Sequence, residues 1–170
     1  MHYTINKGSN KSLPLVPVFS NLGQRNFEFE ITFNEDCLYP QQIINGVVYD
    51  GYNKACGIAF RLFKPNQDAA MLGWRCYNGK LYVVPYFNVD GKNIYGTKET
   101  EVQVDSSIMV KIDVLDTEVM ILIKHKDDIL EQTQVFRKMF GFLKIVHLIN
   151  FWFGGQLPAN QNVSAEIICL

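Results

Sequence analysis

The chain has 170 residues and a formal net charge of −1, with 48% apolar and 19% charged residues. These values exclude a disordered chain and fit one folded domain with a substantial core. The near-neutral charge, without a run of Lys or Arg, argues against nucleic acid as a partner, and no window is long and apolar enough to predict a membrane span. The first residues lack an apolar stretch of signal-peptide length, so we expect no classical secretion.

Strict alternation of apolar and polar residues in the first half of the chain predicts strands with one buried face. It runs from Phe27 to Phe33 in "NFEFEITFN" and again through Ile58 and Phe60 in "ACGIAFRLF". Residues 38–54 between them are poorly patterned, and we expect a long loop of the kind that carries contacts. The loop holds three tyrosines that we expect either to contact a partner protein or to pack over the open ends of the domain: Tyr39, Tyr49 and Tyr52.

The middle of the chain predicts a hairpin, because "AAMLGWRCY" and "KLYVVPYFNV" flank Asn78-Gly79. Pro85 lacks a backbone donor, so the second strand of this hairpin is predicted to lie at a sheet edge or to carry a bulge. Further strands are predicted in "SIMVKIDVLD", "EVMILIKHK" and "VSAEIICL". Residues 129–138 contain Glu, Gln, Arg and Lys, which favour a helix, yet this segment fits a short helix or a strand equally well.

Many short strands separated by turns, with no linker or internal repeat, predict one all-β domain over residues 1–170, either a sandwich or a barrel. The segment "GIAFRLF…AAMLGWRCYNGKLYVVPYFNVDGK" and the later "FWFGGQLPANQNVSAEI" resemble concanavalin A-like jelly-roll domains, including small uncharacterised proteins of Bacteroidetes and their phages. The resemblance covers roughly residues 55–92 and 145–170. It implies an antiparallel β-sandwich of jelly-roll type, an architecture that serves lectins, hydrolases and virion proteins alike.

The predicted hairpin gathers aromatic side chains that are candidates for a sugar platform. Alternation places Tyr82 and Tyr86 on one face of the second strand, whereas Arg75 and Tyr77 share a face of the first strand, opposite Trp74. Exposed Trp and Tyr rings flanked by polar groups suit carbohydrate, so these five residues are candidate sugar contacts. Packing in the core or at an interface explains the same rings, and we favour it because such rings bury large areas.

Catalytic and metal-binding motifs are not evident in the sequence. The carboxylate pairs Glu28/Glu30 and Glu99/Glu101 have the spacing of strand-borne acids, but a pair on the wet face of a strand is ordinary solvated surface. The four cysteines form no C-x-x-C pair, and there is no nucleophile elbow, phosphate loop or calcium loop. We therefore expect a protein without catalytic activity, metal or other cofactor.

The Gly154-Gly155 step follows a strand pattern and precedes Pro158. Glycine adopts positive φ without steric cost, and no helix follows that could cradle an anion. We expect this step to be a structural turn and not a ligand loop.

These observations favour a non-enzymatic virion component, such as an auxiliary decoration protein of a phage capsid, as the resemblance implies. Its partners would be other virion proteins, in particular the capsid, and an oligomer is compatible with this role. The alternative is a lectin-like carbohydrate-binding module, which would bind a glycan through the hairpin aromatics and be cytoplasmic or exported without a signal peptide. Neither nucleic acid nor a membrane is an expected partner.

Overall fold

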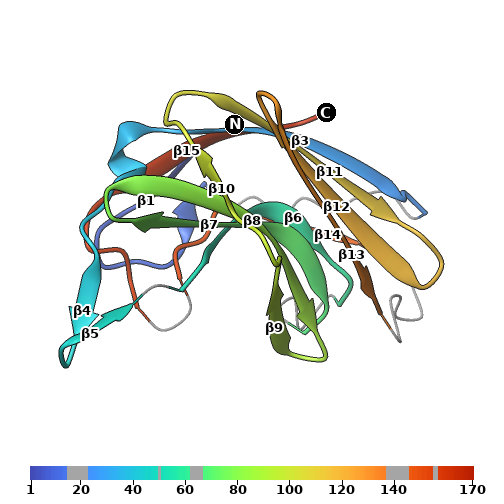
Figure 1. Cartoon of the computed structure of the whole chain (residues 1–170), viewed down its shortest axis with the longest axis horizontal. Coiled ribbons are helices and arrows are strands. Elements are labelled where there is room, and N and C mark those ends of the chain that lie inside the picture. Colours follow the sequence, from blue (N-terminus) through green and yellow to red (C-terminus); the bar gives the residue numbers. More distant parts are fainter. Residues whose placement is uncertain (15–22, 50, 62–66, 137–145, 155–156) are drawn as a thin grey trace.

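The computed structural model describes residues 1–14, 23–49, 51–61, 67–136, 146–154 and 157–170. Two antiparallel sheets pack face to face as an all-β sandwich, as predicted, and a small separate hairpin lies at one end (Figure 1). Within those ranges the one helical element is the 3₁₀ turn η1 (Glu35–Cys37). The described part of the chain accordingly contains no helix of the length and apolar character that crossing a membrane requires.

Strands from distant parts of the chain lie side by side in both sheets. The seven-stranded sheet has the order β13-β12-β11-β3-β15-β1-β2, with bounds β1 (His2–Ile5), β2 (Ser12–Leu13), β3 (Asn26–Phe33), β11 (Ser107–Val114), β12 (Glu118–His125), β13 (Asp128–Val135) and β15 (Val163–Cys169). The six-stranded sheet has the order β10-β8-β7-β6-β14 with β9 also on β8, and its bounds are β6 (Asn53–Ala59), β7 (Ala69–Tyr77), β8 (Lys80–Val89), β9 (Lys92–Tyr95), β10 (Thr100–Val102) and β14 (His147–Ile149). The separate hairpin consists of β4 (Gln42–Ile44) and β5 (Val47–Tyr49).

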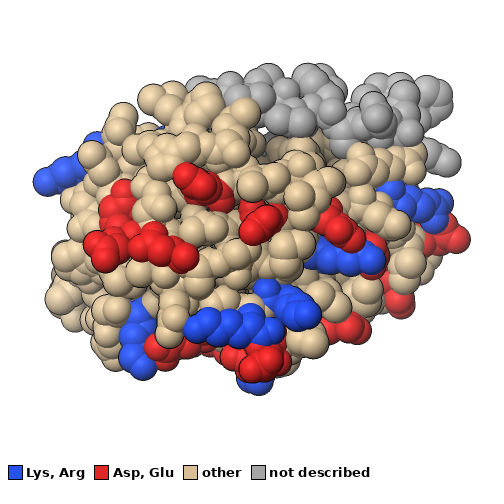
Figure 2. All heavy atoms as spheres, turned by 90° about the horizontal axis from the view of Figure 1, so that it is seen from above, with Lys and Arg blue, Asp and Glu red and all other residues tan. Residues whose placement is uncertain are grey.

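The core lies between the two sheets and is filled by the strand faces that alternation predicts. Ten residues expected there are each at most 2% exposed: Phe27, Phe29, Ile31, Phe33, Ile58, Phe60, Val110, Ile112, Ile121 and Ile123. Between them on β3, Glu28 points outward and lies 3.9 Å from Lys111 of β11. Figure 2 shows acidic and basic side chains interspersed over this outer face of the seven-stranded sheet. Glu28 and Glu30 are therefore part of a mixed, solvated surface, as expected.

The segment that fitted a helix or a strand equally well is a strand. β13 pairs antiparallel with β12, from Val135 opposite Glu118 to Asp128 opposite His125, so the helix alternative is wrong for the described part of residues 129–138. Residues 137 and 138 lie outside the described ranges. The ladder with β12 satisfies the backbone groups, and Leu130 packs into the core. These tertiary contacts outweigh the local helix propensity.

β8 accommodates Pro85 without lying at an edge. It pairs with β7 along one side, while its other side pairs with β10 over residues 81–83 and with β9 over residues 86–89. Pro85 falls between these two ladders, where its carbonyl accepts a hydrogen bond from the Gly96 N–H at 2.8 Å. The expected edge or bulge is thus replaced by a change of partner strand. Either arrangement works because Pro85 has no N–H to offer a ladder.

An aromatic cluster around Trp74 forms the widest part of the core. The Trp74 ring stacks on Phe151 and lies 5.3 Å, centroid to centroid, from Phe33. Its indole N–H donates to the Lys54 carbonyl at 3.3 Å, so the polar atom of the buried ring is satisfied. For Trp74 the packing interpretation is therefore correct.

Candidate functional site

A hollow lies on the outer face of the six-stranded sheet, lined by residues of β6, β8, β9 and the end of the separate hairpin β4–β5. Figure 1 shows the hairpin β8–β9 and the separate hairpin β4–β5 that flank this region. The hollow has a volume of about 270 Å³. Five aromatic side chains line it and define what we call the aromatic groove: Tyr49, Tyr52, Tyr86, Tyr95 and Trp152. Polar groups reach it from Lys54, Asn88 and Asn93. A concave site lined by rings, with a few polar groups, is the general form of a small-ligand site.

Alternation along the strands decides which side chains reach the groove. On β8, Tyr86 and Asn88 belong to the outer face, whereas Phe87 between them packs in the core. Gly73 on β7 pairs with Val84 of β8. A Cβ at position 73 would lie 3.0 Å from Val84 Cγ1 and 3.2 Å from Tyr86 Cβ. A larger residue at this position would crowd the side chains of Val84 and Tyr86.

Three tyrosine rings form one wall of the groove. Tyr95 lies 4.7 Å from Tyr86 and 4.9 Å from Tyr52, centroid to centroid. Tyr95 is 38% exposed and Tyr86 only 3%, so the inner ring supports the ring that meets solvent. Burial raises the pKa of both Tyr52 and Tyr86, and their hydroxyls therefore stay protonated at neutral pH. The wall therefore offers an uncharged aromatic surface.

Arg75 fixes Tyr52 through a shared carboxylate. Arg75 Nη2 donates to Glu99 Oε1 at 2.9 Å and Arg75 Nε donates to Glu99 Oε2 at 3.1 Å, while the Tyr52 hydroxyl donates to that same Oε2 at 2.5 Å. The guanidinium also lies 4.7 Å from the centroid of the Tyr52 ring. Burial alone would raise the pKa of Glu99, but the hydrogen bonds from Arg75 and Tyr52 outweigh it and leave this pKa lowered. The carboxylate stays charged and holds the ring in place.

Lys54 and Trp152 close the opposite side of the groove. Their backbones exchange two hydrogen bonds, from Trp152 N to Lys54 O at 2.8 Å and from Lys54 N to Trp152 O at 2.9 Å. The Lys54 ammonium lies 5.7 Å from the ring of Tyr86, and burial lowers its pKa. A second cation, Lys11, lies over the Trp152 ring at 5.9 Å. This side of the groove thus combines aromatic surface with positive charge.

Gly154 is held by the side chains of Asn53 and Asn10. It has a φ of +25°, and its N–H donates to Asn53 Oδ1 at 2.5 Å. Its carbonyl accepts from Asn10 Nδ2 at 2.9 Å. Gly154 also lines the groove, so these contacts help to shape the site. Gly155 lies outside the described residues.

The structure divides the residues that we named as candidate sugar contacts. Trp74 is fully buried between the sheets, so it presents no ring face to a sugar. Tyr86 lines the groove. Arg75 does not line it, but binds Glu99, which accepts a hydrogen bond from the hydroxyl of the groove residue Tyr52. Tyr77 of β7 and Tyr82 of β8 lie on the same outer face near the turn that joins these strands, where Tyr77 pairs with Lys80 and Tyr82 pairs with Arg75. Neither tyrosine is part of the groove lining.

The three candidate partner-contact tyrosines also separate. Tyr39 is 8% exposed, packs at 5.9 Å from Trp74, and its hydroxyl accepts from Asn53 Nδ2 at 2.9 Å. Burial raises the pKa of Tyr39 to about 12. Tyr39 is therefore a core residue and not a partner contact, as the packing alternative stated. Tyr49 and Tyr52 are half-buried and line the groove.

The segment 38–54 holds a hairpin that the sequence analysis did not anticipate. Asn45 and Gly46 form its turn with φ values of +51° and +78°, which is the same Asn-Gly signal that marks the turn at residues 78–79. Ile43 and Val48 face each other across the ladder and are 66% and 41% exposed. The hairpin therefore presents an apolar pair to solvent.

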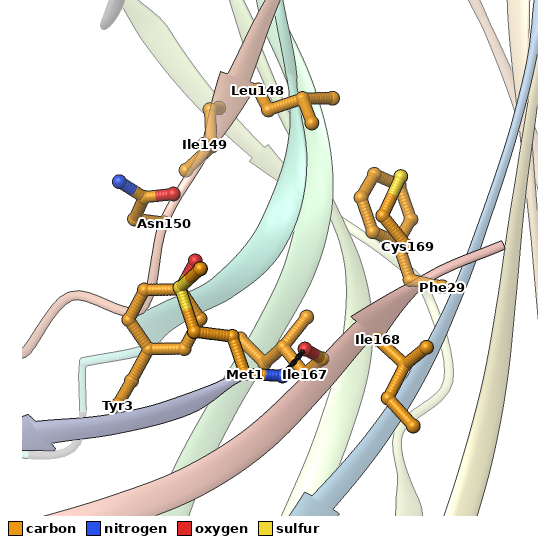
Figure 3. Close-up of a pocket in the computed structure, with 9 residues that line it drawn as sticks. All are labelled: Met1, Tyr3, Phe29, Leu148, Ile149, Asn150, Ile167, Ile168 and Cys169. Carbon is orange, nitrogen blue, oxygen red and sulfur yellow. Dashed lines mark hydrogen bonds between the residues drawn. The ribbon is translucent and has the colours of Figure 1, made fainter. Parts of the chain in front are cut away.

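A second hollow, of about 310 Å³, lies between β14 and the adjacent parts of β1, β3 and β15 (Figure 3). Most of its lining is apolar: Met1, Phe29, Leu148, Ile149, Ile167 and Ile168. The N-terminal ammonium group of Met1 donates a hydrogen bond to the Ile167 carbonyl at 2.6 Å. Cys169 is at its rim, and the described lining offers few polar groups to orient a ligand.

Other reactive groups are dispersed. No cluster of three or more His, Cys, Asp or Glu that could hold a metal occurs in the described ranges. The cysteines are free thiols, of which Cys169 is exposed and the others are buried. Ser106 Oγ lies 2.9 Å from His125 Nε2, but its proton is donated to the Gln103 carbonyl at 2.6 Å. The ring N–H must therefore be the donor to Ser106, and the contact is a structural hydrogen bond.

Comparison with known proteins identifies the fold and no family. No protein-family model and no curated protein matches the chain. The alginate lyase from Klebsiella pneumoniae superposes with a TM-score of 0.58 at 11% identity, over 85% of this chain and 59% of that chain. The GH43B protein of the Bacteroides ovatus xyloglucan PUL gives a TM-score of 0.55 at 12% identity, over 91% of this chain and 29% of that chain. The CBM2 module of the evolved Dit of Lactobacillus casei BL23 phage J-1 gives 0.50 at 6% identity, over 97% of this chain and 74% of that chain.

These similarities establish a β-sandwich fold, as the resemblance to jelly-roll domains implied. At identities of 6–12% they do not support a closer relationship to proteins of Bacteroidetes or of phages. The chain spans only 29% and 59% of the two enzyme structures, so the activities of those proteins do not transfer with the fold.

Proposed function

We propose that the chain is a carbohydrate-binding module without catalytic activity, which binds a glycan in the aromatic groove. The observation that carries this proposal is the tyrosine wall, in which the Tyr95 centroid lies 4.7 Å from that of Tyr86 and 4.9 Å from that of Tyr52, beside the polar groups of Lys54 and Asn88. A sugar ring has an apolar C–H face and a rim of hydroxyls. A site for it needs ring faces and hydrogen-bonding groups at the same place, and the groove supplies both.

The fold similarities support this proposal at a coarser level. The solved structures that share the fold include an alginate lyase, a protein of a xyloglucan PUL and a CBM2 module, all of them named for carbohydrate. These names do not identify the ligand of this chain. They do suggest the first polysaccharides to try, namely xyloglucan and alginate, with xylan and a neutral glucan to widen the panel.

Affinity gel electrophoresis with this panel tests the proposal. We expect at least one polysaccharide to retard the protein, and Tyr95→Ala to weaken the retardation at least tenfold in apparent affinity. Tyr77→Ala is a matched control, because Tyr77 has the same 38% exposure and lies on the same face but outside the groove. Loss of binding in Tyr95→Ala with retention in Tyr77→Ala supports the groove. Equal loss in both variants, or no retardation by any polysaccharide, argues against it.

A second candidate function is the virion component that the sequence resemblance favoured, for instance a decoration protein. The exposed Ile43–Val48 pair on the projecting hairpin favours it, because a small apolar patch is a common anchor for a protein partner. The fold similarity to a module of a phage Dit is compatible with a virion location.

Deleting residues 41–50 tests this second candidate by co-sedimentation with particles. Binding that is lost while the domain still folds supports it. Unchanged binding would show that the hairpin is not part of the interface. If the wild-type protein sediments with no particle, the virion role is not supported and glycan binding remains the proposed function.

A further inference from the structure

Asn88 is an unusual residue in the groove because its side-chain oxygen is buried without a hydrogen-bond partner. It is 1% exposed, and its Oδ1 accepts no hydrogen bond from any described residue. A buried carbonyl oxygen without a donor costs free energy, and native proteins keep few such atoms. Here the atom lies in the lining of the aromatic groove and not in the interior between the sheets.

The neighbours of Asn88 explain why its oxygen has no donor. Ala69 lies opposite it on β7 and has no polar side chain, and Asn93 lies opposite it on β9. The Asn93 amide instead donates to the Tyr95 hydroxyl, at 3.4 Å. The strand pairing therefore holds the Asn88 amide at the wall while the Asn93 amide donates to Tyr95.

We infer that Asn88 is the specificity-determining residue of the groove and accepts a hydrogen bond from a free hydroxyl of a bound sugar ring. This inference rests on the proposed glycan-binding function. Tyr86, two residues earlier on the same strand face, supports the exposed ring of Tyr95, and a sugar ring that lies against Tyr95 places a hydroxyl near Asn88. A carbonyl oxygen interacts favourably with a hydrogen-bond donor and unfavourably with an acceptor. The groove should therefore bind a sugar with a free hydroxyl at this position more tightly than one with an ether or a carboxylate there.

The test compares an oligosaccharide of the retained polysaccharide with its O-methylated form by isothermal titration. Wild-type protein should bind the free form at least tenfold more tightly. In Asn88→Leu, which keeps the approximate volume but lacks the amide, affinity for the free form should fall at least tenfold and the preference over the methylated form should largely disappear. Asn26→Leu, at an exposed position of β3, is the control and should keep both affinity and preference.

A second measurement needs no ligand. Since Asn88→Leu removes an unpaired buried acceptor, its midpoint of thermal unfolding should equal or exceed that of the wild type, whereas a structural asparagine would lower it. Wild-type preference in Asn88→Leu, or wild-type protein that binds the methylated form equally well, overturns the inference while leaving glycan binding intact. If the leucine variant does not fold, Asn88→Ala and the wild-type comparison of the two ligands still decide the question. Failure of every polysaccharide to bind overturns the proposed function itself.

Discussion

The ring of Trp74 stacks on the ring of Phe151, with centroids 5.3 Å apart and an angle of 12° between the planes. Both side chains are fully buried, and the pair joins the central hairpin to the segment that precedes the last strand. Phe151→Ala should therefore lower the free energy of unfolding by about 3–5 kcal/mol, through lost burial and the cavity that remains. Urea unfolding followed by circular dichroism measures this, with Tyr77→Ala as an exposed control. A loss below about 1 kcal/mol would show that the pair is not tightly packed.

Glu99 should make the fold sensitive to acid. Its pKa is lowered in the folded state, so the unfolded chain takes up the proton first as the pH falls. The stability that Glu99 contributes is complete above the ordinary carboxylate pKa and is lost as the pH falls through the lower folded value. Glu99→Gln should cost about 1 kcal/mol at neutral pH, a modest value because the pair is partly exposed, and should flatten the acid limb of the stability curve. Thermal melts across that pH range measure both effects, and parallel curves would contradict the assignment.

His125 should contribute a second pH dependence, with the same sign, near neutrality. Burial lowers its pKa and the adjacent Lys126 lowers it further, while Asp128 opposes this in part. The unfolded chain therefore binds a proton below about pH 6.5 while the folded protein does not, and stability falls as the pH decreases. His125→Gln should reduce this slope, leaving the part due to His147, whose pKa burial also lowers. An unchanged slope between about pH 7 and 5 would exclude His125 as its source.

The thiols should react in two classes. Cys169 is exposed, whereas Cys37, Cys56 and Cys76 are buried, and desolvation raises the pKa of each of these thiols. A thiol reagent at mildly alkaline pH should therefore label one cysteine in the folded protein, more slowly than a free thiol, and all four in denaturant. Mass spectrometry of the labelled protein identifies the site. Rapid labelling of any other cysteine would show that the core opens.

Alternation of apolar and polar residues was sufficient to predict which strand faces are buried wherever the other face of the strand is exposed to solvent. On β3, Phe27 and Phe33 are buried and Glu28 is exposed, as the period of two requires. It was insufficient for β13, because the residues of that strand favour a helix and only pairing with β12 decides the matter. The Asn45-Gly46 turn carried the usual hairpin signal, but its flanking strands have only three residues each, too few for alternation to be seen.

The groove was predictable only in part, because it joins segments far apart in the sequence. The outward position of Tyr86 followed from alternation, and the Asp90-Gly91 turn contained enough information to place Tyr95 opposite Tyr86. Nothing in the sequence indicated that Tyr52 and Trp152 would meet them, since that depends on which distant strands pair: β6 lies beside β7, and Trp152 forms a bridge with Lys54 of β6. The large area of Trp74 made it conspicuous as a sugar platform, yet the same area drives it into the core.

The most direct test of the groove is a crystal structure of the protein with an oligosaccharide of the polysaccharide that it retains. We expect a sugar ring against the exposed face of Tyr95, with one hydroxyl at about 2.5–3.0 Å from the Asn88 amide oxygen. Sugar bound in the second hollow, or on the outer face of the seven-stranded sheet, with the aromatic groove empty at saturating ligand, would contradict the proposed site.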